Sequence, residues 1–209
     1  MTEIVSIERD GPAAARAALE RTVRGGGVAV FPADTLYGLA CDPLDAAAIH
    51  RIDELKGRPA DKPAAVLYFS PLAMRELVAT LGPRTRDALG ALLPGPVTLV
   101  IANPERRYPL ACREDPERLG VRLIDGPLTG AAVAVYQTSA NRSGEQAPSR
   151  FDGVDERVAA GADLAIDGGE LRGQPSTVID LTAIEGSGGW SILREGAVPV
   201  EEIRRRLGG

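Results

Sequence analysis

Gly25-Gly26-Gly27-Val28-Ala29-Val30-Phe31-Pro32 is the stretch that decides the fold class of this 209-residue chain. The three glycines end an amphipathic helix predicted over residues 12–24, because glycine is a poor helix former. The apolar run 28–31 is short and bounded by turn residues, as is typical of a buried strand. A helix followed by a buried strand indicates an α/β protein.

The remaining sequence repeats this mixture. Asp42-Pro43 predicts the start of a helix that runs to about Leu55 and ends at Gly57. Further helices are expected from Ser70-Pro71 onward and over residues 84–93, 128–134, 154–160 and 199–207. Strands are expected over residues 64–69, 97–101, 120–124, 135–138, 164–167, 177–181 and 191–194, with the turn 186–189 forming a hairpin before the last. Because strict βαβ alternation is missing, we expect an α/β (α+β) fold with a twisted mixed sheet and flanking helices, formed by residues 1–209 as a single domain.

The composition restricts the classes of function. A net charge of −5 and an aromatic content of 4% argue against a protein that binds nucleic acid over a broad basic face. His50 is the one histidine and falls in an apolar-periodic stretch, so we interpret it as a structural helix residue. A metal site formed by protein side chains is therefore not expected, nor is a triad of the Ser-His-Asp type.

The cysteines and the apolar pattern indicate a location. Cys41 and Cys112 lie far apart in the sequence and form no CxxC motif. No apolar segment is long enough for a signal region or a membrane span. We therefore expect a cytoplasmic protein without membrane contact.

Lysine is confined to one loop. The 24 basic residues include two lysines, Lys56 and Lys62, and both lie close to Arg58. A loop with three cations, interrupted by Gly57 and Pro59, can enclose an anion, and a guanidinium can bind phosphate or carboxylate through two parallel hydrogen bonds. A helix C-terminus decorated with basic residues explains the same pattern without a ligand.

Two other segments place polar groups directly after a predicted strand. One is Thr138-Ser139-Ala140-Asn141-Arg142-Ser143-Gly144, which offers donors to a ligand but also has the composition of an ordinary surface turn. The other is Pro32-Ala33-Asp34-Thr35-Leu36-Tyr37-Gly38, which a helix N-cap at Asp34 or Thr35 also explains. Neither GxxxxGK[ST] nor GxGxxG is present, so a bound phosphate requires a site of another type.

Seven segments, taken together and in order, resemble the threonylcarbamoyl-AMP synthase family, which has a YrdC-like domain. They are Pro32-Ala33-Asp34-Thr35-Leu36-Tyr37-Gly38-Leu39, Lys56-Gly57-Arg58-Pro59 with Lys62, Pro94-Gly95-Pro96-Val97-Thr98-Leu99-Val100, Gly120-Val121-Arg122, Thr138-Ser139-Ala140-Asn141-Arg142-Ser143-Gly144, Ser176-Thr177-Val178-Ile179-Asp180 and Ile192-Leu193-Arg194-Glu195-Gly196. Each string is weak alone, but their order across residues 28–196 is specific. Longer family members carry an extra C-terminal domain, which we do not expect here.

The resemblance implies an enzyme whose sheet surrounds a concave basic cavity. In the family, L-threonine takes up carbon dioxide or bicarbonate on its amine, and the carbamate oxygen attacks the α-phosphorus of ATP. Pyrophosphate leaves, and a downstream tRNA-modifying transferase complex uses threonylcarbamoyl-AMP to modify an adenosine of tRNA. The resemblance also implies Mg²⁺ bound with ATP and a weak contact with tRNA.

The resemblance assigns residues to each step. Fixed donors that stabilise charge developing at phosphorus are expected from Lys56, Arg58, Ser139 and Asn141. Threonine is expected to bind at Thr35, Arg122 and Ser176, with Arg122 facing its carboxylate. ATP is expected to bind at Arg58, Lys62, Asn141, Ser149 and Arg194.

Three positions depart from the family pattern. Arg118 stands in place of a threonine-like nucleotide contact, and Leu67 in place of a polar residue on the threonine side. Gly126 lies in the stretch 123–127, where the family usually has a Pro-Asp-His-like sequence. These departures leave open whether threonine is the preferred amino acid.

Two other functions are consistent with the sequence. One is a related enzyme that adenylates carbamate derived from carbamoyl phosphate, although such domains usually sit beside partner domains. The other is a non-catalytic RNA-binding module that uses the concave surface, although the acidic balance and scarce aromatic residues argue against it.

Overall fold

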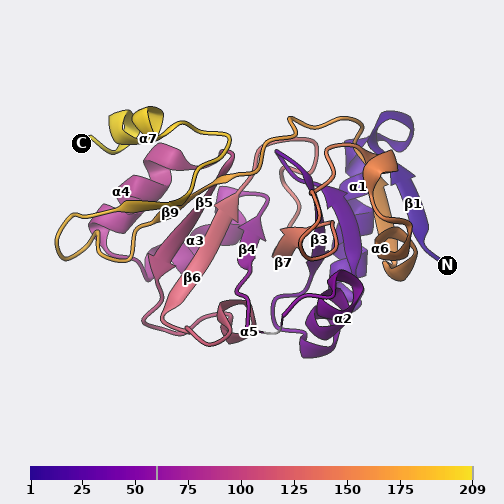
Figure 1. The fold of residues 1–209 in the computed structure, drawn as a ribbon, viewed down its shortest axis with the longest axis horizontal. Helices are drawn as coiled ribbons and strands as arrows, with labels where there is room; N and C mark the ends of the chain where they lie inside the picture. The colour runs from indigo at the N-terminus through magenta and orange to yellow at the C-terminus, as the bar shows by residue number, and fades with distance from the viewer. Residues whose placement is uncertain (60, 209) are drawn as a thin grey trace.

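One mixed ten-stranded sheet organises the part of the chain that the computed structural model describes, residues 1–59 and 61–208. Its strand order is β1-β8-β2-β3-β7-β4-β6-β5-β9-β10, and Figure 1 labels β1, β3, β7, β4, β6, β5 and β9. The strands are β1 (Glu3–Ser6), β2 (Ala29–Pro32), β3 (Tyr37–Cys41), β4 (Ala65–Tyr68), β5 (Val97–Ala102), β6 (Arg118–Leu123), β7 (Ala134–Ser139), β8 (Leu164–Asp167), β9 (Thr177–Asp180) and β10 (Ser191–Arg194). The helices are α1 (Ile7–Arg24), α2 (Ala46–Lys56), α3 (Pro71–Ala79), α4 (Pro83–Leu92), α5 (Pro109–Cys112), α6 (Glu156–Gly161) and α7 (Val200–Leu207), with a 3-10 turn at Phe151–Gly153.

The two faces of the sheet bury separate cores. In β2, Val30 belongs to one apolar cluster while Ala29 and Phe31 belong to the other, because successive side chains of a strand point to opposite faces. Helices α2, α3, α4 and α7 contribute to the first cluster. On the second face, α1 packs against β1, β8, β2 and β3. The strands at the opposite end of the strand order, β6, β5, β9 and β10, lie beyond α1.

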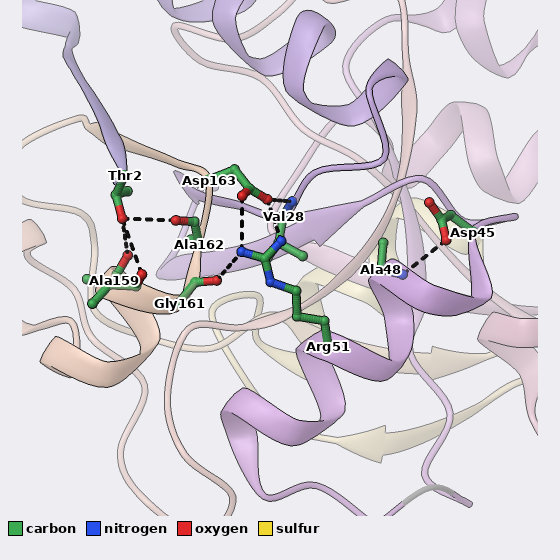
Figure 2. Close-up of polar contacts among 10 residues, drawn as sticks. Thr2, Val28, Asp45, Ala48, Arg51, Ala159, Gly161, Ala162 and Asp163 are labelled. Atoms are coloured by element: carbon green, nitrogen blue, oxygen red, sulfur yellow. Dashed lines mark hydrogen bonds and ion pairs between the residues drawn. The ribbon is translucent and has the colours of Figure 1, made fainter.

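Helix α2 is fixed to the sheet through one carboxylate, as Figure 2 shows. Asp163 accepts a hydrogen bond from the backbone N–H of Val28 at 2.8 Å and pairs with the guanidinium of Arg51 at 2.7 Å. Arg51 also donates to the carbonyl of Gly161. These bonds join α2, α6 and the ends of β2 and β8, so the position of α2 follows from the sheet.

The structure corrects three sequence predictions. Residues 34–35 lie in the connection of a β2–β3 hairpin and cap no helix, since Pro32 pairs with Tyr37 at the end of β2. Asp45 caps α2 by accepting from Ala47 and Ala48, whereas Asp42 accepts from Leu44 in the preceding turn. Residues 128–134 form a turn and the start of β7 rather than a helix, and Gly130 there has a φ of +94°, outside helical geometry.

Other predictions agree with the structure within a few residues. The helices predicted at 12–24, 71 onward, 84–93, 154–160 and 199–207 form, as does the C-cap of α2 at Gly57. The predicted strands also form, while β1, β3 and α5 had not been predicted. His50 is exposed on α2 and lies 3.4 Å from Glu54. None of the described helices is both long and apolar enough to cross a membrane.

Candidate functional site

A cavity of about 560 Å³ opens on the face of the sheet that carries α1. Its floor includes Ala65 of β4, Gly120 of β6 and Gln137 of β7, which are register partners and therefore point to one side. Ala65 points to the same side of the sheet as Leu67, which belongs to the apolar cluster that packs against α1 (the α1 core). The cavity is therefore the part of this face that α1 leaves uncovered. Its volume is in the range of small-ligand sites.

Four of the predicted cationic residues line this cavity, although they come from distant parts of the sequence. They are Arg58, Lys62, Arg122 and Arg194. Thr35, Ser139 and Ser176 line it as well. The chain thus brings seven of the predicted site residues together, which gives the cavity hydroxyl donors and positive charge.

Lys56 is directed inward by the helix that carries it. The buried positions of α2 are Ala48, Ile49, Ile52, Asp53 and Lys56, the spacing of one helix face. The ammonium donates to the carbonyl oxygen of Ser139 and, at 2.5 Å, to that of Asn141. Burial, together with the charges of Arg58 and Lys62, lowers the pKa of Lys56 to about 7, and Asp53 opposes this shift. Lys56 therefore holds the end of β7 beside the cavity without lining it.

Arg58 leaves α2 just past the left-handed Gly57 and reaches the cavity wall. Its guanidinium donates to Thr138 Oγ1 at 2.8 Å and to the carbonyl of Pro63 at 2.6 Å. Nε is buried without a partner among the described residues. Burial lowers the pKa of this guanidinium. A cation that is desolvated and incompletely bonded is prepared to bind an anion.

Arg122 is the most buried cation of the cavity. Its guanidinium pairs with Asp34 at 2.5 Å and donates to Gln137 Oε1 at 3.1 Å. The exposed fractions of the two paired side chains are 5% and 8%. The carboxylate of Asp34 therefore fixes the orientation of Arg122 and compensates its charge in the free protein.

Arg194 and Ser176 form a second polar group in the cavity. Arg194 donates to the carbonyl of Ser176 at 2.7 Å and to its hydroxyl at 3.2 Å, and that hydroxyl lies 2.9 Å from Thr98 Oγ1. Partial burial and the charge of Arg122 lower the pKa of the Arg194 guanidinium. Two cations that repel each other across a cavity favour a bound anion between them.

Asn141 and Ser149, two other predicted site residues, do not line the cavity. Asn141 donates to the carbonyls of Arg142 and Glu145, and its own carbonyl oxygen accepts from Lys56. Ser149 accepts from the backbone of Leu171 through its carbonyl. Both residues shape loops around the cavity. Ala60, inside the predicted cation loop, lies outside the described residues.

The three departures from the expected pattern differ in their positions. Arg118 lines the cavity and pairs with Asp180 at 2.5 Å. Leu67 is fully buried in the α1 core and is not among the lining residues. Gly126 is exposed in the turn after β6. Arg118 is therefore the departure that changes the cavity wall.

Sequence reasoning missed three residues that organise the site. Gln137 is an amide inside the apolar run before Thr138, a signal that was available. Asp53 lies three residues before Lys56 on the same buried face of α2, and this spacing could be seen in the sequence. Its partner Arg113, bound at 2.5 Å, lies 60 residues away, and no local pattern indicates that pairing.

The described side chains that line the cavity offer cationic and hydroxyl groups rather than a cluster of metal ligands. Among the described residues, no group of three or more His, Cys, Asp or Glu side chains could hold a metal ion. The cavity wall includes Asp115, which lies 3.9 Å from Arg118. The donors present therefore suit anions.

Comparison with known proteins identifies the family. Residues 21–196 match the Sua5/YciO/YrdC family, described as "Telomere recombination". The chain belongs to the Sua5/YciO/YrdC family. A threonylcarbamoyl-AMP synthase from Pyrococcus abyssi is 35% identical over 198 residues, which are 89% of this chain and 55% of that protein. A threonylcarbamoyl-AMP synthase from Thiobacillus denitrificans is 33% identical over 173 residues, which are 80% of this chain and 91% of that protein.

A solved member of the Sua5/YciO/YrdC family has the same fold. The crystal structure of P. abyssi Sua5 complexed with L-threonine superposes with a TM-score of 0.84 at 31% identity. The match covers 100% of this chain and 61% of that chain. The present chain thus spans little more than half the length of the Pyrococcus protein. The mixed sheet with flanking helices is the fold of this family, as the sequence predicted.

Proposed function

We propose that this chain is an L-threonylcarbamoyladenylate synthase, a nucleotidyltransferase that uses L-threonine, bicarbonate or carbon dioxide, and ATP. The observation that carries the proposal is the convergence of Arg58, Lys62, Arg122 and Arg194 on one cavity. Relatives named threonylcarbamoyl-AMP synthase, and a neighbour crystallised with L-threonine, support the same reaction. Because strands β1 to β10 share one sheet, we propose that the 209 residues act as one domain.

We place the amino acid at the floor of the cavity. Arg122 would bind the threonine carboxylate through its guanidinium, since Asp34 and Gln137 already hold the group in place. Thr35 and Ser176 line the same cavity, and their hydroxyls would contact the polar groups of threonine. The amine is then held beside the phosphate-binding side chains, where its carbamate can react.

We place the triphosphate against the cations nearer the rim. Arg58, Lys62 and Arg194 would bind phosphate oxygens, with Ser139 donating at the reaction centre. In this arrangement Lys56 and Asn141 act on the end of β7 that carries Ser139, because their bonds join it to α2. Ser149 would contribute to the nucleotide side through the position of its loop.

The chemistry then requires no histidine and no covalent intermediate. The threonine amine adds to carbon dioxide and loses a proton to give a carbamate. A carbamate oxygen attacks the α-phosphorus, the bond to the β-phosphate oxygen breaks, and pyrophosphate leaves with the electron pair. Fixed donors aimed at the developing charge contribute about 3–4 kcal/mol each in comparable sites. A walled cavity also limits hydrolysis of the carbamate.

The remaining components of the proposal follow from the substrates. Mg²⁺ would enter with ATP and be held by phosphate oxygens and water, which is consistent with the lack of a carboxylate cluster in the described cavity wall. Threonylcarbamoyl-AMP would pass to a tRNA-modifying transferase complex, with a weak tRNA contact at this chain.

The test is a turnover assay with ATP, Mg²⁺, bicarbonate and single amino acids. We expect pyrophosphate release that depends on threonine, and an adenylate of the mass of threonylcarbamoyl-AMP. Equal release with serine or glycine would contradict threonine as the preferred substrate. Salt-sensitive tRNA binding without ATP turnover would instead favour the RNA-binding alternative.

A further inference from the structure

The stretch between α2 and β4 that carries Arg58 and Lys62 is called the cation loop here. The segment between β5 and β6, residues 103–117, contacts the chain on either side of this loop. At the start of the loop, Arg113 binds the carboxylate of Asp53 in the last turn of α2 at 2.5 Å. At its end, the backbone N–H of Ala64 donates to the carbonyl of Ala111 at 2.9 Å. Arg58 lies between these two attachments in the sequence, so contacts with residues 103–117 fix the backbone on both sides of it.

The attachment at Asp53 is buried and has additional partners. The exposed fractions of the Arg113 and Asp53 side chains are 15% and 10%. The same Arg113 nitrogen donates to the hydroxyl of Tyr136 at 3.2 Å, and the guanidinium lies 5.8 Å from the centre of that ring. The carbonyl of Asp53 accepts from the backbone N–H of Arg58 at 2.9 Å. Asp53 therefore links Arg113 to Arg58, which lines the cavity.

The segment itself is rigidly organised around one buried amide. Asn103 is 3% exposed, and its side chain donates to the carbonyls of Arg107 and Pro116 at 2.9 and 2.8 Å. Arg113 has a φ of +60°, a conformation that costs energy for a residue other than glycine. The buried contact with Asp53, rather than the positive φ alone, marks Arg113, because Arg106 has a φ of +50° and pairs with an exposed carboxylate.

The geometry points to Arg113 as a positioning residue for the cation loop. It holds the end of α2 and neutralises Asp53, which otherwise competes with bound phosphate for Arg58. This inference rests on the proposed function, since the anion it serves is the triphosphate of ATP. Arg113 itself does not line the cavity, so its action passes through Asp53. The charge of Asp53 raises the pKa of both Lys56 and Arg58 against the lowering effect of burial.

The test compares Arg113→Gln with a matched control, Arg106→Gln. Arg106 lies in the same segment, also has a positive φ, and pairs with Glu117 on the exposed surface. We expect Arg113→Gln to weaken ATP affinity, measured by calorimetry without threonine, by roughly tenfold. The KM for threonine should change less, because Arg122 is held by other residues. Arg106→Gln should leave both values unchanged.

The double variant Asp53→Asn/Arg113→Gln tests whether Arg113 acts by neutralising Asp53, because it removes the uncompensated carboxylate along with the link between the two residues. Removing both charges leaves no uncompensated carboxylate beside Arg58, so we expect ATP affinity to recover in part. A double variant that binds ATP as weakly as Arg113→Gln would overturn the inference.

Amide exchange tests the positioning without any ligand. The amide of Arg58 should exchange roughly tenfold faster in Arg113→Gln and at the wild-type rate in Arg106→Gln. Unchanged exchange or unchanged ATP affinity in folded Arg113→Gln would overturn the inference. Faster exchange in Arg113→Gln, together with no ATP binding by the wild-type protein, would contradict the proposed function alone.

Discussion

The guanidinium of Arg122 and the carboxylate of Asp34, 88 residues apart in the sequence, form an ion pair of 2.5 Å beside the cavity that Arg122 lines. The second oxygen of Asp34 and Nε of Arg122 have no partner among the described side chains. The pair therefore holds a charged group in place at a site from which water is largely excluded. Orientation before binding reduces the cost of ordering when a carboxylate arrives.

Breaking this pair should reduce stability strongly. Asp34→Ala leaves the charge of Arg122 buried and uncompensated, so we expect the free energy of unfolding to fall by about 3–5 kcal/mol. Urea unfolding monitored by circular dichroism measures this. The exposed pair Arg106–Glu117 is the control, and Glu117→Ala should cost at most about 1 kcal/mol. Equal losses in the two variants would contradict the structural role of Asp34.

Removing the guanidinium of Arg58 should abolish most turnover. Arg58→Ala deletes a donor expected to stabilise charge at the phosphates, so kcat/KM for ATP should fall roughly 100- to 1,000-fold. Arg58→Lys should recover little, because an ammonium cannot reproduce the planar fork that bonds Thr138 and Pro63. Arg86→Ala, at an exposed position of α4, is the control. Turnover by Arg58→Ala within a factor of about three of wild type would exclude this role.

Lys56 should give the stability an unusual pH dependence. Its pKa is about 7 in the folded protein, below the ordinary 10.5, so between these values the unfolded chain binds more protons than the folded one. The free energy of unfolding therefore rises with pH across this window, and below pH 7 the full cost of the buried charge remains. Compared with Lys56→Met, wild-type protein should become relatively more stable as the pH rises from about 7 to about 9. A constant difference between the two proteins would show that the pKa is not lowered.

Gly38 should not tolerate a side chain. A Cβ there would lie 2.9 Å from a ring carbon of Phe31 and 3.1 Å from the amide nitrogen of Gln137. Gly38→Ala should therefore destabilise the protein by about 1–3 kcal/mol and displace Gln137 from Arg122. Gly90→Ala is the matched control, because a Cβ at that helical position meets nothing within 4 Å and should stabilise by up to about 1 kcal/mol. Thermal unfolding of both variants provides the comparison.

Local patterns predicted most of the elements but not all. Glycine and proline positions located the ends of α1, α2 and α4, because these residues act on the backbone nearby. The edge strand β1 was missed since it has four residues, of which only Val5 is buried. The hairpin strand β3 was missed because Pro32 predicts a break, whereas it occupies the last position of β2. Residues 128–134 have helical composition, but their turn packs in the α1 core.

The residues of the candidate site also fall into a group that local patterns predicted and a group that they did not. Arg58, Arg122 and Arg194, which line the cavity, could be named from motifs, because chemistry restricts the residue types that bind phosphate and carboxylate. The partners that fix them, Asp34 and Arg113, come together through sheet register and tertiary packing, which no spacing in the sequence encodes. Sequence therefore gave the candidates for ligand contact, and the structure was needed for the groups that hold them.

A crystal structure with L-threonine and a non-hydrolysable ATP analogue tests the central claim most directly. The account predicts phosphate oxygens within hydrogen-bond distance of Arg58, Lys62 and Arg194, and the threonine carboxylate on Arg122. Phosphates bound outside this cavity, or threonine bound away from Arg122, would contradict it.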